Sequence, residues 1–188
     1  MAERLVIYRF VKPFFVSQMF GETKIDYTKY GIPSHNGLDV PTTDWQPVYS
    51  GHDGIVSEVF TDKAAGNGVR IKTTEKYAWE KGEHFFKLGY WHLAASNVKV
   101  GEKVGVGQLI GWADSTGNVT GSHVHFELKA LNDDGSVFEH SNGWYGAQNC
   151  WPYMATQDAF ELNSTIKKIQ LQLADLLSRL QDWLSKRG

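Results

Sequence analysis

The segment 122-SHVHFEL-128 alternates polar and apolar residues, which is the pattern of a β-strand with one face in a core. Because side chains two positions apart point to the same side of a strand, His123 and His125 present two imidazoles on one face. Val124 and Phe126 then point into the core. Neighbouring neutral imidazoles suit a borderline metal such as zinc, although a histidine pair also arises by accident of surface composition.

Short apolar or alternating segments of this kind fill the chain up to about residue 160 and are separated by glycine, asparagine or aspartate. The others are 54-GIVSEVF-60, 68-GVRIKT-73, 85-FFKLGYWHL-93, 98-VKV-100 and 108-QLIGWA-113. Their close spacing, without a helical period between them, predicts a mainly β protein with an antiparallel sheet rather than alternating strands and helices. The 19 glycines suit tight turns and bulges in such a sheet.

The C-terminal segment has a different pattern, because glycine and proline are missing from Ser164 almost to the end. Apolar residues recur there at alternating intervals of three and four, namely at Ile166, Ile169, Leu173, Leu176, Leu180 and Trp183. This heptad pattern predicts one amphipathic helix of about 22 residues over 164–186. Asn163 or Ser164 is expected as the N-cap, and Lys186 and Arg187 suit the negative end of the helix.

We therefore expect residues 1–160 to form one β domain and residues 161–188 to form an appended helix. Two interpretations of the helix stay open. Either its apolar side packs back onto the sheet of its own domain, or it serves self-association or docking on a partner. Three heptads are close to the minimum for a coiled coil, so the pattern does not decide between them.

Composition and charge exclude several classes of protein. The 188 residues are enough for one domain and an appendage, and 41% of them are apolar, which suffices for a sizeable core. A net charge of −2 without a basic block predicts no nucleic-acid partner. Basic residues interrupt 1-MAERLVIYRFVKPFF-15, so no signal peptide is visible, and we predict no transmembrane segment. The single cysteine, Cys150, excludes an internal disulfide.

The segment 35-HNGLD-39 places a histidine and a carboxylate four positions apart. On a straight strand His35 and Asp39 would lie roughly 13 Å apart and would not bind one ion. Gly37 permits a sharp bend that would bring the two side chains together. The alternative is an ordinary loop that carries a surface histidine and a turn aspartate.

A further histidine, His92, lies in 90-YWHLA-94 at the end of an aromatic-rich segment. Strand alternation predicts that Tyr90 shares the face of His92 and that Trp91 and Leu93 share the other. The pattern alone leaves open whether His92 lies in the core or lines a groove.

Together these residues match the needs of a catalytic metal site. A catalytic zinc takes three protein ligands and keeps a fourth position open, and His35, Asp39 and one histidine of the 123/125 pair would supply the three. Zinc lowers the pKa of its bound water towards neutrality, and Asp39 lowers the net charge of the site. The other histidine of the pair and His92 would take the proton of the water and stabilise the oxyanion. Hydrolysis of an amide requires this set of parts.

Four segments in this order resemble the lysostaphin-type (LytM-domain) zinc endopeptidases, over about residues 17–130. They are 35-HNGLD-39, 47-PVYSGHDGIVSEV-59, 89-GYWHL-93 and 98-VKVGEKVGVGQLIGWADSTGNVTGSHVHFEL-128. The resemblance implies that one zinc ion per chain is bound by His35, Asp39 and His125. It implies that His92 and His123 are the catalytic histidines. The implied fold of residues 1–160 is a twisted antiparallel β-sheet with a substrate groove.

The function implied by the resemblance is hydrolysis of peptide bonds in peptidoglycan stem peptides or cross-bridges. Peptidoglycan peptides would be the partner, and the place of action would be extracellular, periplasmic or at the cell wall. Family members that lack metal ligands act only as activators, so the alternative is a non-catalytic module that binds peptidoglycan or activates another hydrolase. All five side chains are present here, which favours a working enzyme. Ser34, Ser122 and Val124 depart from the common family residues without removing a functional group.

The walls of the groove are expected to come from loops. The candidate loops are 61–68, 74–84 and 132–150, and the candidate aromatic contacts for substrate are Trp144, Tyr145 and Trp151. Surface packing of these rings is the alternative. Glu127 is expected to face away from His125 and to serve at most as a polar partner of a ligand, not as the general base.

Overall fold

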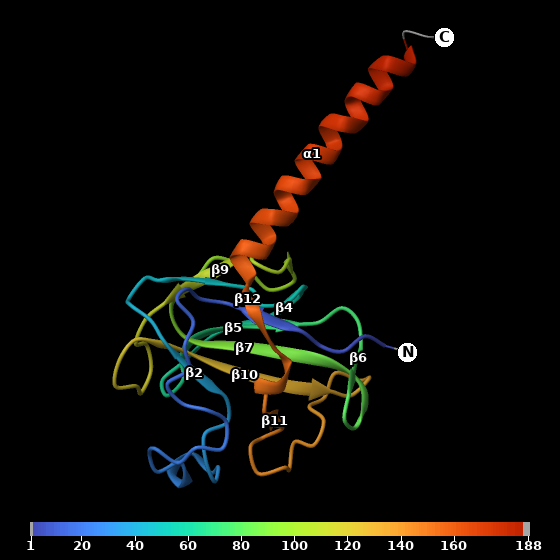
Figure 1. Cartoon of the computed structure of the whole chain (residues 1–188). Helices are drawn as coiled ribbons and strands as arrows, with labels where there is room; N and C mark the ends of the chain where they lie inside the picture. The colour runs from blue at the N-terminus through green and yellow to red at the C-terminus, as the bar shows by residue number, and fades with distance from the viewer. Residues whose placement is uncertain (1, 186–188) are drawn as a thin grey trace.

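The chain folds into a β domain from which a long helix projects (Figure 1). The computed structural model describes residues 2–185, except for the side chains of residues 160, 162, 163, 182 and 185. The strands are β1 (Ile7–Arg9), β2 (Leu38–Pro41), β3 (Pro47–Tyr49), β4 (Gly54–Asp62), β5 (Gly66–Lys72), β6 (Tyr77–Trp79), β7 (Gly82–Ser96), β8 (Lys103–Val104), β9 (Leu109–Ala113), β10 (His123–Leu131), β11 (Ala147–Gln148) and β12 (Met154–Asp158). The helices are two short 3-10 turns, η1 (Thr28–Tyr30) and η2 (Trp151–Tyr153), and the α-helix α1 (Ala159–Ser185).

The main sheet is antiparallel and follows the order β11-β10-β7-β5-β4-β8. Strand β2 pairs with the start of β10, and β3 pairs with β9 beside the end of β7. The predicted mainly β fold with an antiparallel sheet is therefore confirmed. The predicted strand 98–100 is wrong, because this segment is a loop and turn between β7 and β8 from which Val98 packs into the core.

The core lies on one face of this sheet. Alternate residues of β5, β7 and β10 are fully buried there, namely Val69, Ile71, Leu88, Tyr90, Val124, Phe126 and Leu128. His123 and His125 lie between buried residues of β10 and point to the opposite face, as the alternation predicts. The sheet therefore separates an apolar side from a side that carries the candidate chemistry.

Strands β1 and β12 form a small parallel sheet that covers the core. Leu5, Ile7 and Phe10 from the N-terminal segment are buried in it, and the Phe10 ring stacks on that of Phe126 with 4.8 Å between centroids. Burial of one such side chain stabilises a fold by about 1.5–3 kcal/mol. The N-terminal segment and the segment around β12 thus pair with each other and pack on the core of the main sheet.

Helix α1 continues directly from β12 and begins at Ala159, so the predicted N-cap at Asn163 or Ser164 is wrong. The Lys12 ammonium contacts both Asp158, at 3.8 Å, and Glu161, and so holds the first turn against the N-terminal segment. The heptad pattern begins at Ile166 and therefore does not reveal this earlier start. The predicted basic end at Lys186 and Arg187 lies outside the described residues.

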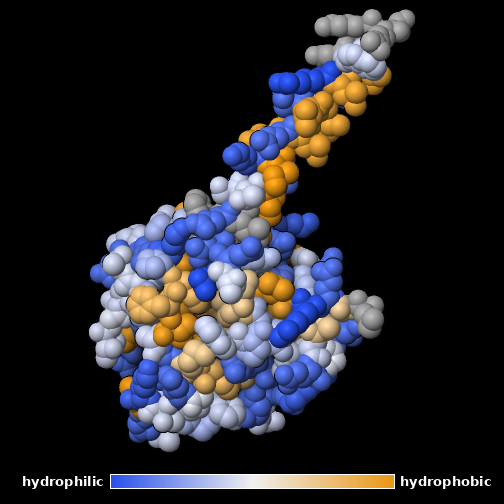
Figure 2. Space-filling model, viewed as in Figure 1, coloured by the Kyte–Doolittle hydropathy of each residue, from blue (hydrophilic) through white to orange (hydrophobic). Residues whose placement is uncertain are grey.

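The helix extends away from the β domain, and its apolar residues form a stripe along one side (Figures 1 and 2). The heptad residues are between 38% exposed, at Ile166, and 60% exposed, at Leu176. The interpretation that the helix packs back on its own sheet is therefore wrong, since β1 and β12 already cover the core. Among the described residues, no helix is both long and apolar enough to cross a membrane.

Candidate metal centre and active site

The pairing of β2 with β10 brings the predicted metal ligands together. The antiparallel register sets Asp39 opposite His125 and Pro41 opposite His123. His35 reaches the same place because the chain bends at Gly37, immediately before β2. A side chain at position 37 would lie 2.3 Å from the Phe126 carbonyl oxygen, so this close approach of two backbones requires glycine.

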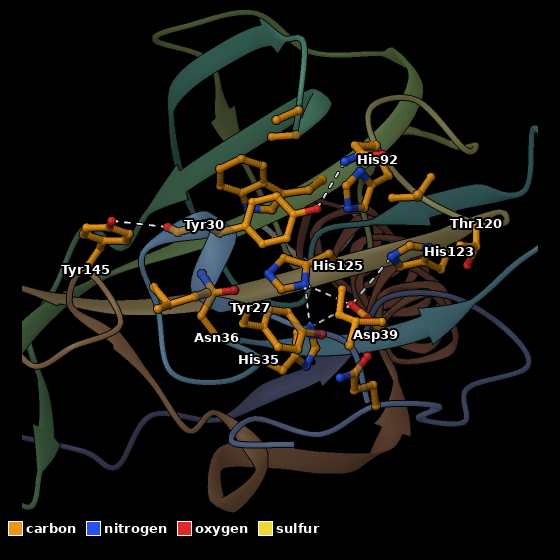
Figure 3. Close-up of a pocket in the computed structure, with 18 residues that line it drawn as sticks. Tyr27, Tyr30, His35, Asn36, Asp39, His92, Thr120, His123, His125 and Tyr145 are labelled. Atoms are coloured by element: carbon orange, nitrogen blue, oxygen red, sulfur yellow. Dashed lines mark hydrogen bonds and ion pairs between the residues drawn. The ribbon is translucent and has the colours of Figure 1, made fainter. Parts of the chain in front are cut away.

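Three ligand atoms converge at this point (Figure 3). The His35 Nε2 atom lies 3.1 Å from Asp39 Oδ1 and 2.9 Å from His125 Nδ1, and the last two atoms are 2.9 Å apart. Zinc bonds of about 2.0–2.1 Å at a tetrahedral angle separate neighbouring ligand atoms by about 3.3 Å. The triangle therefore fits a tetrahedral ion after movements of a few tenths of an ångström.

Contacts around the triangle orient two of its members. The other ring nitrogen of His35, Nδ1, lies 3.0 Å from the Met19 carbonyl oxygen, so a proton on Nδ1 leaves the Nε2 lone pair facing the centre. Burial alone would raise the pKa of the Asp39 carboxyl, but hydrogen bonds from His125 and His35 outweigh it and hold that pKa well below its ordinary value. Asp39 therefore supplies a negative charge at neutral pH, which favours a cation.

His92 reaches the site through a β-bulge. Asn67 and Gly68 are consecutive on β5, but their partners on β7, Leu93 and Trp91, have His92 between them. His92 is the extra residue of the bulge and has a φ of +63°.

Because of this bulge, the prediction that Tyr90 shares the face of His92 is wrong. Tyr90 is fully buried in the core, whereas Trp91 and His92 both line the pocket. Strict alternation fails here because one unpaired residue shifts the side chains on either side of it. His92 therefore lines the pocket rather than the core.

His92 and His123 lie next to each other beside the triangle, with 4.7 Å between ring centroids (Figure 3). The Nδ1 atom of His92 lies 2.9 Å from the Thr116 carbonyl oxygen, and that of His123 lies 2.8 Å from the Gly121 carbonyl oxygen. Protons on these Nδ1 atoms leave both Nε2 atoms as acceptors. Burial, followed by the charges of His125 and His123, lowers the pKa of His92 to about 4, so His92 is neutral at pH 7.

The five residues stand in a pocket of about 330 Å³. Its walls come from the segment between Gln18 and Ile32, from Ala64 and Ala65, from 118–120 and from Tyr145. The predicted wall loops 61–68 and 132–150 thus contribute, but 74–84 is wrong, because it holds β6, which pairs with the far end of β7. The wall formed by residues 18–32 was missed, since this segment has neither a strand period nor a ligand motif.

Aromatic residues of the pocket differ in part from those expected. Tyr145 lines the pocket as predicted, together with Tyr27, whose pKa is raised to about 12 by burial and by the charge of Asp39. The Tyr27 hydroxyl therefore remains a hydrogen-bond donor. Trp144 instead donates its indole N–H to Ser34 Oγ at 3.0 Å, and Trp151 lies in η2, outside the pocket lining.

Glu127 lies on the same face of β10 as His125, so the expected opposite orientation is wrong. Residues two apart share a face, and Phe126 and Leu128 are the core residues between and after them. Glu127 is buried, accepts a hydrogen bond from Asn36 Nδ2 at 2.9 Å and pairs with Lys129 at 3.2 Å. It acts as a support for Asn36, which lines the pocket.

Comparison with known proteins shows similarity to metallopeptidases. A sequence profile of Peptidase family M23 matches residues 33–138. Peptidoglycan DD-endopeptidase ShyA of Vibrio cholerae is 34% identical over 113 residues, which are 60% of this chain and 24% of that protein. Glycyl-glycine endopeptidase ALE-1 of Staphylococcus capitis is 37% identical over 95 residues, 50% of this chain and 24% of that one. The chain thus spans about a quarter of the length of these curated relatives.

Solved structures with the same fold include the catalytic domain of lysostaphin from Staphylococcus simulans. It has a TM-score of 0.58 and 27% identity, and the match covers 74% of this chain and 91% of that domain. A zinc-containing peptidase from Vibrio cholerae has a TM-score of 0.56 and 31% identity, over 69% of this chain and 37% of that one. Since the profile covers more than half of the chain, including the ligand triangle and both neighbouring histidines, the chain belongs to peptidase family M23.

Proposed function

We propose that this chain is a zinc-dependent endopeptidase that hydrolyses peptide bonds in the stem peptides or cross-bridges of bacterial peptidoglycan. The observation that carries the proposal is the triangle of His35, Asp39 and His125 in an open pocket, with two further histidines beside it. The relatives named as peptidoglycan and glycyl-glycine endopeptidases support the substrate class. The chain would accordingly act in the extracellular space, the periplasm or the cell wall.

In this proposal His35, Asp39 and His125 hold one zinc ion. Two imidazole nitrogens and one carboxylate oxygen are a donor set that zinc accepts, and the pocket leaves room for a fourth ligand. When bound, zinc supplies Lewis acidity, which polarises the scissile carbonyl and lowers the pKa of water towards neutrality.

The proposed catalytic residues are His92 and His123, which transfer the proton of the attacking water. Both Nδ1 atoms face backbone carbonyls, so the Nε2 atoms are the acceptors for the proton of the attacking water, and the Nε2 atom of His123 lies 3.6 Å from Asp39 Oδ1. The oxygen of the water bonds to the carbonyl carbon, the C–N bond breaks, and the histidines pass the proton to the leaving amine. The histidine that holds this proton in the interval also stabilises the oxyanion by its positive charge.

The competing function is a non-catalytic module that binds peptidoglycan or activates another hydrolase. Such a module needs no complete ligand set and no pair of acceptor histidines in the same pocket. The convergence of all five side chains therefore favours the hydrolase.

Digestion of defined muropeptides by the metal-replete protein, followed by mass spectrometry, tests the proposal. The expected result is a new amine and a new carboxylate at one peptide bond. Chelation should abolish this product and zinc should restore it. Binding of muropeptides without any cleavage would establish the non-catalytic module instead.

We also propose that residues 1–160 are the peptidase domain and that α1 associates with α1 of a second copy. Two features support this pairing. The exposed heptad residues are joined by Leu177 and Leu184, and together they expose apolar area on the order of 800 Å² per chain, which is one partner's share of a stable interface. Their period of 3.5 residues is that of a coiled coil.

Sedimentation of the full chain tests the pairing with a matched pair of variants. Leu180→Glu places a charge in the apolar stripe, and Ser178→Glu places the same charge outside it. Wild type and S178E should sediment as oligomers, and L180E should sediment as a monomer. Monomeric wild type at micromolar concentration would refute self-association.

A further inference from the structure

Trp45, in the loop between β2 and β3, combines two unusual properties. Its φ is +61°, a left-handed conformation that glycine and asparagine adopt readily and that a bulky side chain disfavours. The residue is also 62% exposed, which is the largest exposed fraction of a tryptophan among the described residues. A strained backbone and an exposed indole both oppose stability, so stability does not explain this residue.

The backbone of the loop does not require an indole. The Trp45 amide donates to the Ala113 carbonyl at 2.8 Å, a bond that any non-proline residue would make. Gln46 Oε1 accepts from the Thr43 amide at 3.0 Å, and Gln46 Nε2 donates to the Lys12 carbonyl at 3.1 Å. These contacts fix the loop and thereby present the indole outward.

The indole does have one partner, Trp112 on β9. The ring centroids lie 6.3 Å apart with 50° between the planes, so the two rings form an exposed aromatic surface, here called the Trp45/Trp112 platform. The two exposed residues before Trp45, Thr43 and Asp44, carry a hydroxyl and a carboxylate, and the Thr43 hydroxyl, which donates to Gln46 Oε1 at 3.3 Å, can still accept a hydrogen bond. Aromatic faces flanked by a few polar groups are suited to ligands that are apolar on one side and hydroxylated at the edges.

The backbone next to the platform is hydrogen-bonded to the backbone of the candidate active site. The loop follows β2, which carries Asp39, and the Thr42 amide donates to the Ser122 carbonyl at 3.1 Å, next to His123. On the other side, Asp114 follows β9 and donates its amide to the His92 carbonyl at 3.0 Å. The platform is therefore held by the same backbone segments that hold both proposed catalytic histidines.

Among the described residues, four that are not glycine have a left-handed φ, namely Trp45, His92, Glu139 and Tyr145, and two of them lie at this site. His92 and Tyr145, which line the pocket, have φ values of +63° and +53°. Strained residues gather at ligand-binding positions, where the surrounding structure enforces a particular side-chain direction. Trp45 shares this property and lies outside the pocket lining, so a ligand that contacts it would do so with a part that does not enter the pocket.

We propose that the Trp45/Trp112 platform is a saccharide subsite on which a sugar ring of the peptidoglycan glycan strand stacks while the attached peptide enters the pocket. The inference rests on the proposed function, because it assigns the carbohydrate part of the same substrate. The C–H groups of a sugar ring carry partial positive charge and face the negative aromatic surface. The hydroxyl and acetamido groups at the ring edge would hydrogen-bond to Thr43 and Asp44.

The first test measures binding of soluble, peptide-free oligomers of N-acetylglucosamine to the full chain by calorimetry. Trp45→Asn removes the indole and relieves the left-handed strain, so its melting temperature should equal or exceed that of wild type. Its affinity for the oligomer should fall about fivefold or more. Trp45→Tyr keeps an aromatic face and should stay within about twofold of wild type. Trp151→Asn removes another exposed tryptophan outside the pocket, 47% exposed against 62% for Trp45, and should bind like wild type.

The second test separates this inference from the proposed peptidase activity. On muropeptides that carry sugars, W45N should raise KM about fivefold with kcat unchanged, and on sugar-free peptides both constants should match wild type. If wild type cleaves neither substrate, the peptidase proposal fails while the calorimetric result still decides the subsite. Equal oligomer binding by W45N and wild type, or no binding by wild type, would overturn the subsite.

Discussion

The pocket and helix α1 both have polar and apolar side chains at regular intervals, but the apolar side chains are buried at the pocket and exposed on the helix. In the pocket, polar side chains from β2, β7 and β10 face each other and the apolar residues between them are fully buried. In α1, apolar side chains are spaced regularly but face outward, with Leu173 at 55% exposed and Leu180 at 52%. A periodic pattern therefore says which residues share a face, and only the neighbouring elements decide what that face meets.

The β domain and helix α1 therefore differ in where their stability comes from. The β domain has its own core, closed by β1 and β12, and no described residue of α1 belongs to this core. The helix lacks a core within its own chain, so its apolar stripe gains stability only by association.

The largest effect is expected for His125→Ala. Loss of one of three ligands should remove both zinc and turnover, because two protein ligands do not hold the ion at micromolar concentration. Metal analysis after dialysis and muropeptide digestion measure the two losses. His140→Ala, an exposed histidine outside the pocket lining, serves as the control and should keep both.

His123→Ala should separate turnover from metal binding. The variant should keep one zinc per chain, but kcat should fall by about 10²–10⁴, the usual contribution of a proton-transferring group. The same two measurements apply. Equal zinc loss in H123A and H125A would show that the roles within the pair are assigned wrongly.

Leucine-to-alanine changes compare the core with the helix. Leu128→Ala in β10 should lower the free energy of unfolding by about 2–5 kcal/mol, since the side chain is fully buried. Leu180→Ala should leave the melting of the β domain unchanged and weaken self-association instead. Chemical denaturation and sedimentation equilibrium distinguish the two outcomes, and an equal loss of stability in both variants would break the comparison.

The smallest effect concerns the pH dependence of the metal-free protein. The pKa of His92 is lowered to about 4 in the folded chain, against an ordinary value of 6.5. Below pH 6.5 the unfolded chain therefore binds a proton that the folded chain does not, so stability is lost as pH falls towards 4. His92→Gln should reduce this loss by on the order of 2 kcal/mol. Thermal unfolding of both proteins between pH 7 and pH 4.5 measures it, and identical curves would exclude a buried neutral His92.

Much of the fold and of the site could be predicted from local patterns. Alternation in β10 correctly put His123 and His125 opposite Val124 and Phe126, and the bend at Gly37 lies where the spacing of 35-HNGLD-39 required one. Both features depend only on residues close in sequence. The roles of the five site residues remain predictions.

The features that could not be predicted depend on long-range pairing. The bulge at His92 is set by the register of β7 against β5, and strand alternation alone therefore misplaced Tyr90. The start of α1 lies at Ala159, before the heptad pattern begins, and Lys12 from the remote N-terminal segment contacts Asp158 and Glu161 there. The pocket wall at residues 18–32 is positioned by contacts such as the one between the Met19 carbonyl oxygen and His35 Nδ1. No sequence motif predicts these contacts.

Zinc-edge X-ray absorption on metal-replete protein tests the central claim most directly. The claim is that remote side chains on β2, on β10 and at the bend before β2 gather around one cation with a free position. The account predicts one zinc per chain, a first shell of nitrogen and oxygen at about 2.0–2.1 Å, and loss of that signal in H125A. A chain that binds no zinc, or a zinc whose four positions are all filled by protein atoms, would contradict it.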